Sequence, residues 1–233
     1  MQQQIPLGFH FNDEVTLDSY VPGPNAEALD ALRQLTAQDA EPFIYLWGRN
    51  GVGKSHLLQA LGLAVTRQNL PVALITLRDH QQYPPQILQG LEQLSLVCID
   101  DIDAIEKIAD QAGWEEALFH LFNRVRENKT PLLVTASVAP AKLNLQLNDL
   151  KSRLGWGLTF QLRSISDDQK IEVLQKRAQH RGMELNAEVG RYLVTRFSRD
   201  MGSLVALLET LDNVSLAEQR RLTIPFVKQA IAD

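Results

Sequence analysis

A glycine-rich stretch followed by lysine and serine is the first group of residues whose spacing suggests chemistry. Residues 48–55 read GRNGVGKS and match the pattern G-x-x-x-x-G-K-[ST] in full. In this pattern the glycines let backbone N–H groups face phosphate oxygens, the lysine reaches the β- and γ-phosphates, and the hydroxyl binds Mg²⁺. We therefore expect a phosphate-binding loop here, with Ser55 at the metal. The candidate nucleotide-binding residues of this stretch are Gly48, Asn50, Gly51, Val52, Gly53, Lys54, Ser55 and His56.

Two carboxylates at the end of an apolar run are the second such group. Residues 94–101 read LSLVCIDD. We expect Asp100 to bind nucleotide-associated Mg²⁺ through its water shell, and Asp101 to polarise an attacking water. The alternative for Asp101 is that it caps the turn that follows.

The elements that position these residues follow an alternating pattern. Asn25 is expected to cap the helix 25–38. Short apolar runs separated by helices are typical of a parallel sheet covered on both faces. The predicted strands are 44–47, 72–77, 94–99, 132–135 and 158–162, and the predicted helices are 25–38, 54–68, 86–92, 114–128 and 149–154. Trp114, Phe119 and Phe122 fall on helical spacings and are expected in the core, and packing is also expected for Trp47 and Trp156.

Beyond about residue 163 the apolar pattern becomes helical. Helices are expected over 166–181, 186–197 and 202–217, and Pro225 is expected in the first turn of a last one. The predicted organisation is a tail (1–16), an α/β nucleotide-binding domain (17–163) and a helical domain (164–233).

Composition limits the class of protein. The chain has 233 residues, a net charge of −5 and one cysteine, Cys98. The single cysteine indicates a reducing compartment. Together with the absence of a secretion signal and of a long apolar run, it predicts a cytoplasmic protein without a membrane partner. The acidic balance argues against direct DNA binding, which normally needs a basic surface. The five histidines show no metal-ligand spacing.

Five stretches together resemble the AAA+ ATPase module of the DnaA family of bacterial replication initiators. They are LWGRNGVGKSHLLQA, LVCIDDID, LVTASVAP, LKSRLGWGLT and RRLTIPFVKQAI. The resemblance implies a P-loop AAA+ fold, with a five-stranded parallel sheet followed by a small helical lid. It also implies that Arg153 is an arginine finger, which points at the γ-phosphate held by a neighbouring subunit and so acts in trans. The alternative for Arg153 is an ordinary surface salt bridge.

The layout further resembles the Hda family of regulatory inactivators of DnaA. The chain ends directly after the helical region, which leaves no expected DNA-reading domain. This resemblance implies two partners, DnaA and the β sliding clamp of DNA polymerase III, with DNA reached only through the clamp. It implies stimulated hydrolysis of DnaA-bound ATP, and AAA+ surfaces favour a homo-oligomer such as a dimer.

The N-terminal tail contains a candidate clamp-binding peptide. Gln2, Ile5 and Leu7 fit a glutamine followed by aliphatic residues, and the stretch 4–9 fits almost as well. An extended apolar tail of this kind suits a preformed pocket on a partner. The alternative is an irregular terminus with a few apolar residues.

Two positions depart from the DnaA pattern. Ser137 stands where the family carries aspartate, and Gly202 stands where the lid carries an arginine, with Arg199 nearby. Both changes should weaken transition-state stabilisation more than nucleotide binding. We expect bound ADP, or ATP, with Mg²⁺ and weak or no intrinsic hydrolysis. The matching linker of the family places Tyr20 and Val21 beside the base.

Two other functions fit part of the sequence. One is an autonomous AAA+ ATPase, such as a helicase loader or a DnaA-like remodeller, which would need effective residues at both altered positions. The other is a small-molecule kinase, which would leave the Arg153 motif and the helical region unexplained.

Overall fold

The computed structural model describes all residues except 1–14, 38–40, 198–199, 219–220 and 233. The chain divides into two units. The α/β unit comprises residues 1–20, 25–49 and 54–162, and the second unit comprises the short segments 21–24 and 50–53 together with the helical region 163–233. Each unit is described here by itself.

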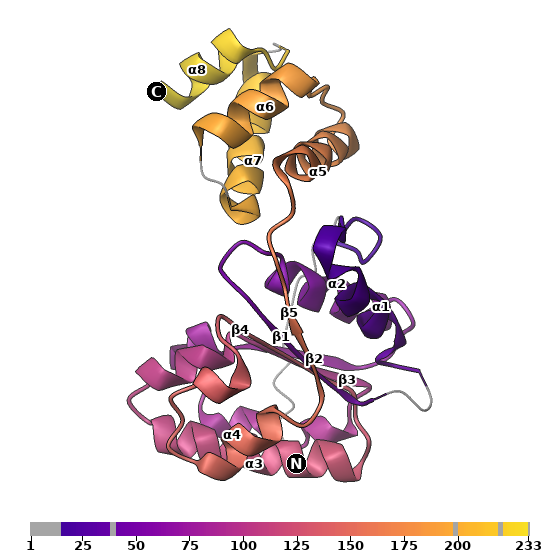
Figure 1. The fold of residues 1–233 in the computed structure, drawn as a ribbon, viewed down its shortest axis with the longest axis vertical. Coiled ribbons are helices and arrows are strands. Elements are labelled where there is room, and N and C mark those ends of the chain that lie inside the picture. Colours follow the sequence, from indigo (N-terminus) through magenta and orange to yellow (C-terminus); the bar gives the residue numbers. More distant parts are fainter. Residues whose placement is uncertain (1–14, 38–40, 198–199, 219–220, 233) are drawn as a thin grey trace. The chain divides into compact units, whose positions relative to one another are not determined.

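A five-stranded sheet forms the centre of the α/β unit (Figure 1). The spatial order is β2-β3-β4-β1-β5, and all neighbouring strands are parallel. The strands are β1 (Phe43–Trp47), β2 (Val72–Thr76), β3 (Leu96–Asp100), β4 (Leu132–Ala136) and β5 (Leu158–Gln161). The predicted five-stranded parallel sheet is therefore confirmed.

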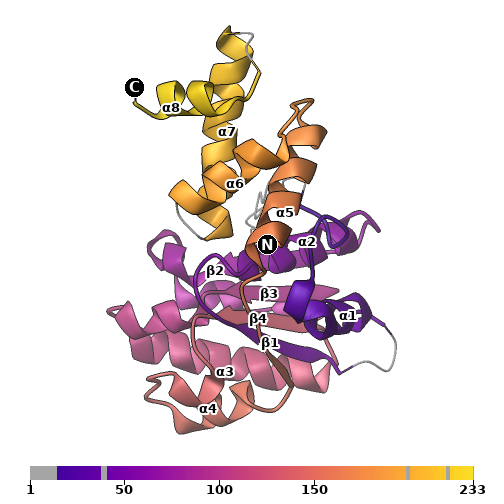
Figure 2. The ribbon, with the colours of Figure 1, turned by 45° about the horizontal axis from the view of Figure 1, so that its top comes forward.

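Helices cover both faces of this sheet, as Figures 1 and 2 show. α1 (Ala26–Gln34) and α2 (Lys54–Thr66) lie on one face, and α3 (Gln111–Glu127) and α4 (Asn148–Leu154) lie on the other. Buried strands with apolar side chains on both faces need such cover, which explains the continuous apolar runs of β3 and β4.

Two local predictions are wrong. Asn25 occupies the N-cap position of α1 but makes no side-chain capping bond, and its side-chain amide donates to the Tyr20 hydroxyl at 3.0 Å. The segment 86–92 is not one helix. It forms two 3₁₀ turns, Pro85–Leu88 and Leu91–Gln93, separated by Gly90 at φ 79°, a left-handed conformation that favours glycine.

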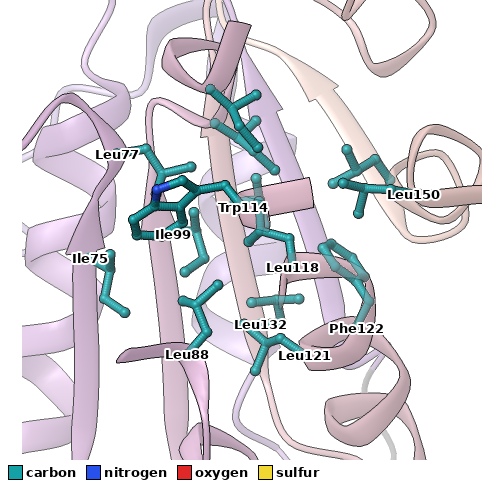
Figure 3. Packing of buried hydrophobic residues seen from close by; sticks show 14 of the residues in the cluster. Ile75, Leu77, Leu88, Ile99, Trp114, Leu118, Leu121, Phe122, Leu132 and Leu150 are labelled. Carbon is teal, nitrogen blue, oxygen red and sulfur yellow. The ribbon is translucent and has the colours of Figure 1, made fainter. Parts of the chain in front are cut away.

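The main core lies between the sheet and α3 (Figure 3). Trp114 and Phe122 are buried in it, as predicted, and Phe119 and Trp47 are partly buried against it. Trp156 contradicts the packing prediction, since it is 54% exposed.

The helical unit has its own core. It contains α5 (Asp167–His180), α6 (Ala187–Arg196), α7 (Met201–Glu218) and α8 (Ile224–Ala232). Ser166 caps α5 through a reciprocal pair of bonds with Gln169. The apolar faces of the four helices pack together around Leu174, Leu193, Leu208 and Phe226. None of the helices in the described residues is long and apolar enough to cross a membrane.

Candidate functional site

The phosphate-binding loop connects the carboxyl end of β1 to the first residue of α2. Gly51 and Gly53 have φ of 78° and 100°, conformations that side chains other than glycine rarely adopt. The Lys54 ammonium is buried and donates to the Gly48 carbonyl at 2.9 Å and the Arg49 carbonyl at 3.2 Å. The loop backbone therefore holds a cation where incoming phosphates would need one.

Burial lowers the pKa of Lys54, and the nearby carboxylates Asp101, Asp100 and Asp103 oppose that shift. These acidic groups lie at the same edge of the sheet as the loop, because the carboxyl ends of parallel strands meet there.

The structure places Asp100 at the end of β3 against the neighbouring strand β4. Thr135 donates its hydroxyl to Asp100, and the Asp101 backbone N–H donates to the same Thr135 oxygen at 3.1 Å. The Asp100 carboxylate is thus held in place while buried. Sequence reasoning did not identify Thr135, although a hydroxyl within the apolar strand LLVTA was a visible signal.

Asp101 has a different environment from the one expected. It does not cap the following turn, because its side chain makes no capping bond. Instead the Arg78 guanidinium pairs with it, with 2.7 Å between Nε and Oδ2. Burial and the neighbouring Asp100 raise the pKa of Asp101, against the opposing effect of Arg78. Arg78 lies just beyond β2, and nothing in the sequence pattern linked it to Asp101.

Ser137 lies directly after β4, beside a carboxylate that sequence reasoning also missed. Its backbone N–H donates to Asp103 Oδ1 at 3.0 Å, and its hydroxyl donates to Asp103 Oδ2. The carboxylate of Asp103 therefore lies beside Ser137, the residue at the position where the DnaA pattern carries aspartate.

Tyr20 and His56 lie together at the start of α2. Their rings are 5.6 Å apart between centroids, and burial raises the pKa of Tyr20. His56 Nε2 lies 3.3 Å from the Thr16 carbonyl and 3.5 Å from the Ser19 hydroxyl. His56 thus joins the cradle helix to the segment before α1, which agrees with a satisfied side chain rather than a catalyst. Val21, which follows Tyr20, is partly exposed.

These residues fit a nucleoside phosphate with Mg²⁺. The loop offers backbone donors and a buried ammonium, and Ser55 and Asp100 offer the one or two protein oxygens with which Mg²⁺ is ordinarily bound beside phosphates.

Arg153 occupies the last turn of α4, half-buried between aromatic rings. Its guanidinium carbon lies 4.5 Å from the Phe119 ring centre and 5.1 Å from that of Trp156, and it donates a hydrogen bond to Asn123. Arg126 lies over the Trp156 ring at 4.6 Å. Rings and cations thus alternate in the order Phe119, Arg153, Trp156, Arg126. These contacts explain how the Trp156 ring can be held in place while it remains exposed.

A groove of about 910 Å³ adjoins this stack. Its walls include Phe43, Phe122, Arg126, Lys129, Arg153 and Trp156. Arg153 therefore lines a surface groove and is not enclosed in the core.

The remaining predicted positions lie elsewhere. Gly202 is the second residue of α7, whose first turn is capped by Asp200 accepting from the Ser203 N–H at 2.9 Å. Arg199 and the tail residues Gln2, Ile5 and Leu7 lie outside the described residues.

Family models match both parts of the chain. The bacterial DnaA ATPase domain matches residues 11–161, and the lid domain of Hda matches residues 167–231. The chain belongs to the DnaA family of AAA+ proteins, with the lid of Hda. An AAA+ ATPase domain of this family implies nucleotide binding.

Solved structures show the same fold. Domain III of the Thermotoga maritima replication initiator DnaA is 21% identical, with 97% of this chain and 98% of that chain covered and a TM-score of 0.81. AMPPCP-bound DnaA from Aquifex aeolicus is 20% identical, with 86% and 66% covered and a TM-score of 0.71. The Thermotoga maritima RuvB branch migration motor is 16% identical, with 93% and 71% covered and a TM-score of 0.68.

Proposed function

We propose that this protein is a nucleotide-bound regulator of replication initiation. In this proposal it links the β sliding clamp of DNA polymerase III to DnaA and stimulates hydrolysis of DnaA-bound ATP, with Arg153 acting as a finger in trans. DNA is reached only through the clamp. The membership in the DnaA family and the Hda lid support this regulatory class.

The observation that carries the proposal is the position of Arg153 relative to its own phosphate-binding loop. The loop leaves the carboxyl end of β1, whereas α4 leads into the amino end of β5. β1 and β5 are parallel neighbours, with Ile44 opposite Leu158. Arg153 and Lys54 therefore lie at opposite edges of one sheet, so that Arg153 is directed away from the nucleotide of its own chain. A phosphate that Arg153 contacts must belong to another subunit.

The aromatic stack supplies the physical means. A guanidinium held over two rings keeps its donors available at the edge while losing few conformations on binding. Arg153 placed against a partner's triphosphate would neutralise charge that develops on the transferred phosphoryl group. Hydrolysis would then depend on assembly.

Three features support weak hydrolysis by the chain itself. The carboxylate of Asp101, the proposed water-polarising group, is engaged by Arg78 at 2.7 Å. Both donors of Ser137 are engaged by Asp103. Gly202 provides no cation in α7. The cradle formed by residues 48–56, with Tyr20 and Val21 beside the base and Ser55 and Asp100 at Mg²⁺, would hold ADP or ATP without efficient turnover.

The other parts of the proposal concern location and assembly. Gln2, Ile5 and Leu7 in the tail 1–16 would bind the clamp, the domain 17–163 would bind nucleotide, and the domain 164–233 would act as the lid. The AAA+ surfaces would also form a dimer. The single cysteine fits the reducing cytoplasm. The kinase alternative loses its basis, since the chain belongs to the DnaA family.

A reconstituted reaction with DnaA–ATP and clamp loaded on DNA tests the arginine. We expect Arg153→Ala to reduce the stimulated hydrolysis on the order of 10³-fold, as is typical for an arginine finger. Arg33→Ala is the matched control, because Arg33 forms an exposed ion pair with Asp18 and such pairs contribute little. Undiminished stimulation by Arg153→Ala would contradict the proposal.

Rapid ATP turnover by the purified chain alone would instead favour the autonomous ATPase. Loss of stimulation on deleting residues 1–9 would support the clamp-binding tail.

A further inference from the structure

The groove beside Arg153 lies at one edge of the sheet. Its walls come from the starts of β1 and β4, from the second half of α3, and from the turn between α4 and β5. These walls contain the amino ends of parallel strands, whereas the phosphate-binding loop leaves the carboxyl end of β1. A molecule bound in the groove would therefore not compete with a nucleotide held by the same chain.

Apolar side chains form much of the lining. Phe122, Val125 and Leu132 line the groove and are buried, and Pro42 and Phe43 are partly exposed at it. The volume of about 910 Å³ lies within the range of ordinary binding pockets, about 300–1,000 Å³. The groove is thus large and apolar enough to take aliphatic or aromatic side chains of a partner.

The charges around the groove are unbalanced. Its described lining contains three cations, Arg126, Lys129 and Arg153, against one carboxylate, Glu41. Arg126 and Arg153 contact aromatic rings, and Lys129 and Glu41 are exposed. Among the residues that the structure describes, none of these four side chains has an ion-pair partner. A local surplus of cations on a chain of net charge −5 indicates an acidic partner.

The apolar lining favours a protein as that partner. Nucleic acid could use the cations, but it presents mainly phosphate and sugar to a surface of this kind. Protein interfaces instead combine an apolar centre with a polar rim, as this groove does. Moreover, a protein whose triphosphate reaches Arg153 must approach the groove, because Arg153 is part of its wall.

We propose that this groove is a docking surface for an acidic, apolar segment of the protein whose triphosphate Arg153 contacts. In such a segment, aspartate or glutamate residues flank an aliphatic or aromatic side chain. The apolar side chain enters the groove, and the carboxylates lie near Lys129 and Arg126. This inference rests on the proposed function, and it adds a determinant of affinity that is separate from the arginine finger.

The reconstituted reaction with DnaA–ATP and clamp loaded on DNA separates docking from catalysis, because varying DnaA–ATP gives both KM and kcat. We expect Lys129→Glu to raise KM for DnaA–ATP about fivefold and to leave kcat unchanged, since charges at the rim of an interface act mainly on association. Glu41→Gln removes the opposing charge and should lower KM about twofold. Lys142→Glu, at an exposed position outside the groove, makes the same charge change as Lys129→Glu and should alter neither constant.

The opposite signs of these two effects distinguish docking from damage to the fold, because damage would not tighten binding. Unaltered KM values in both Lys129→Glu and Glu41→Gln would overturn the inference. A lower KM in Lys129→Glu would indicate a basic segment and would also overturn it. A labelled single-stranded DNA oligonucleotide provides a further arm: if it binds the unaltered protein and Lys129→Glu abolishes that binding, the groove belongs to nucleic acid instead.

Failure of the arginine-finger proposal has a different signature, because Arg153→Ala would then leave kcat unchanged whatever happens at Lys129. If the unaltered protein does not stimulate hydrolysis at all, the same variants are compared in direct binding of AMPPCP-bound DnaA. In that measurement, absence of binding by the unaltered protein, or equal dissociation constants for it and Lys129→Glu, would overturn the inference.

Discussion

The side chain of Arg153 depends on Trp156, a residue that is half exposed to solvent and yet has a defined contact. The guanidinium lies between the Trp156 and Phe119 rings, 5.1 Å and 4.5 Å from their centres. Cation–π contacts contribute from about 0.5 to about 2 kcal/mol according to their solvation. The stack is therefore strong enough to orient the arginine and weak enough to let it move.

We expect Trp156→Ala to lower stimulation of DnaA-bound ATP hydrolysis about fivefold, which corresponds to loss of about 1 kcal/mol of orientation. Trp156→Phe keeps a ring and should remain near the unaltered rate. In the background of Arg153→Ala, Trp156→Ala should have no further effect, because the two residues would act as one unit. Additive losses in that double variant would show that Trp156 acts independently of Arg153.

At this scale the sequence predicted the residues that belong to a contiguous motif and missed those that reach the site from elsewhere. The loop, Asp100 and Asp101 follow from short patterns. Arg78, Thr135 and Asp103 do not, because their partners lie on neighbouring strands and the strand order is not written in any local spacing. The exposure of Trp156 was missed for a similar reason, since its stacking partner Arg126 comes from α3.

Among the elements, α4 is the one that must be held firmly, because it carries Arg153. The buried carboxylate of Glu115 on α3 accepts from the backbone N–H groups of Gln146 at 3.0 Å and Leu147 at 2.6 Å, just before α4 begins. Gln111 also donates to it at 2.7 Å. The charge is thus satisfied by neutral donors, and the entry to α4 is fixed to α3.

Glu115→Ala should lower the free energy of unfolding by on the order of 3 kcal/mol, because it leaves two backbone donors without their acceptor. Glu115→Gln keeps one carbonyl acceptor and should be less severe. Urea titration measures both values. A loss below about 0.5 kcal/mol for the alanine variant, which is typical of ordinary surface changes, would contradict this role.

The turn between α4 and β5 contains two glycines with different requirements. A Cβ at Gly157 would lie 2.2 Å from the Phe43 carbonyl oxygen, whereas a Cβ at Gly155 would first meet the Ser152 carbonyl oxygen at 3.4 Å. The first position lets the backbone approach β1 closely, and the second has ordinary space.

Gly157→Ala should therefore destabilise the protein by about 1–3 kcal/mol through displacement of β1 or β5. Gly155→Ala, the control only two residues away, should change stability by less than about 0.5 kcal/mol. Thermal unfolding of the two variants checks the contrast. Similar melting temperatures for both would argue that β5 adapts without strain.

Helices and strands were predicted well where the spacing of apolar residues and the length of the segment indicate the same type of element. All five strands of the sheet lie within two residues of their predicted limits, and the helices 54–68 and 114–128 correspond to α2 and α3. The stretch after β2 was predicted poorly, because prolines and a left-handed glycine produce 3₁₀ turns that have no apolar period. Asn25 makes no side-chain cap, although it occupies the N-cap position that the sequence predicted.

At the scale of the whole molecule, the resemblance to one family predicted the class of protein, and individual residues predicted the candidate chemistry. The family models confirm the AAA+ fold, the DnaA relationship and the Hda lid. The contacts within the candidate site depend on side chains that meet only after folding, such as Asp103 beside Ser137. A pattern of letters carries no direct information on such encounters.

The order of the strands has a consequence for biosynthesis. β1 carries the start of the cradle, yet it pairs with β4 and β5, the last two strands to leave the ribosome. While β2 and β3 are being synthesised, β1 has no partner strand and remains an unpaired apolar segment. Long-range parallel pairing of this kind is slow and leaves strands open to aggregation. A nascent chain would therefore gain its capacity to hold nucleotide only late in synthesis, after the strands that flank β1 have been made.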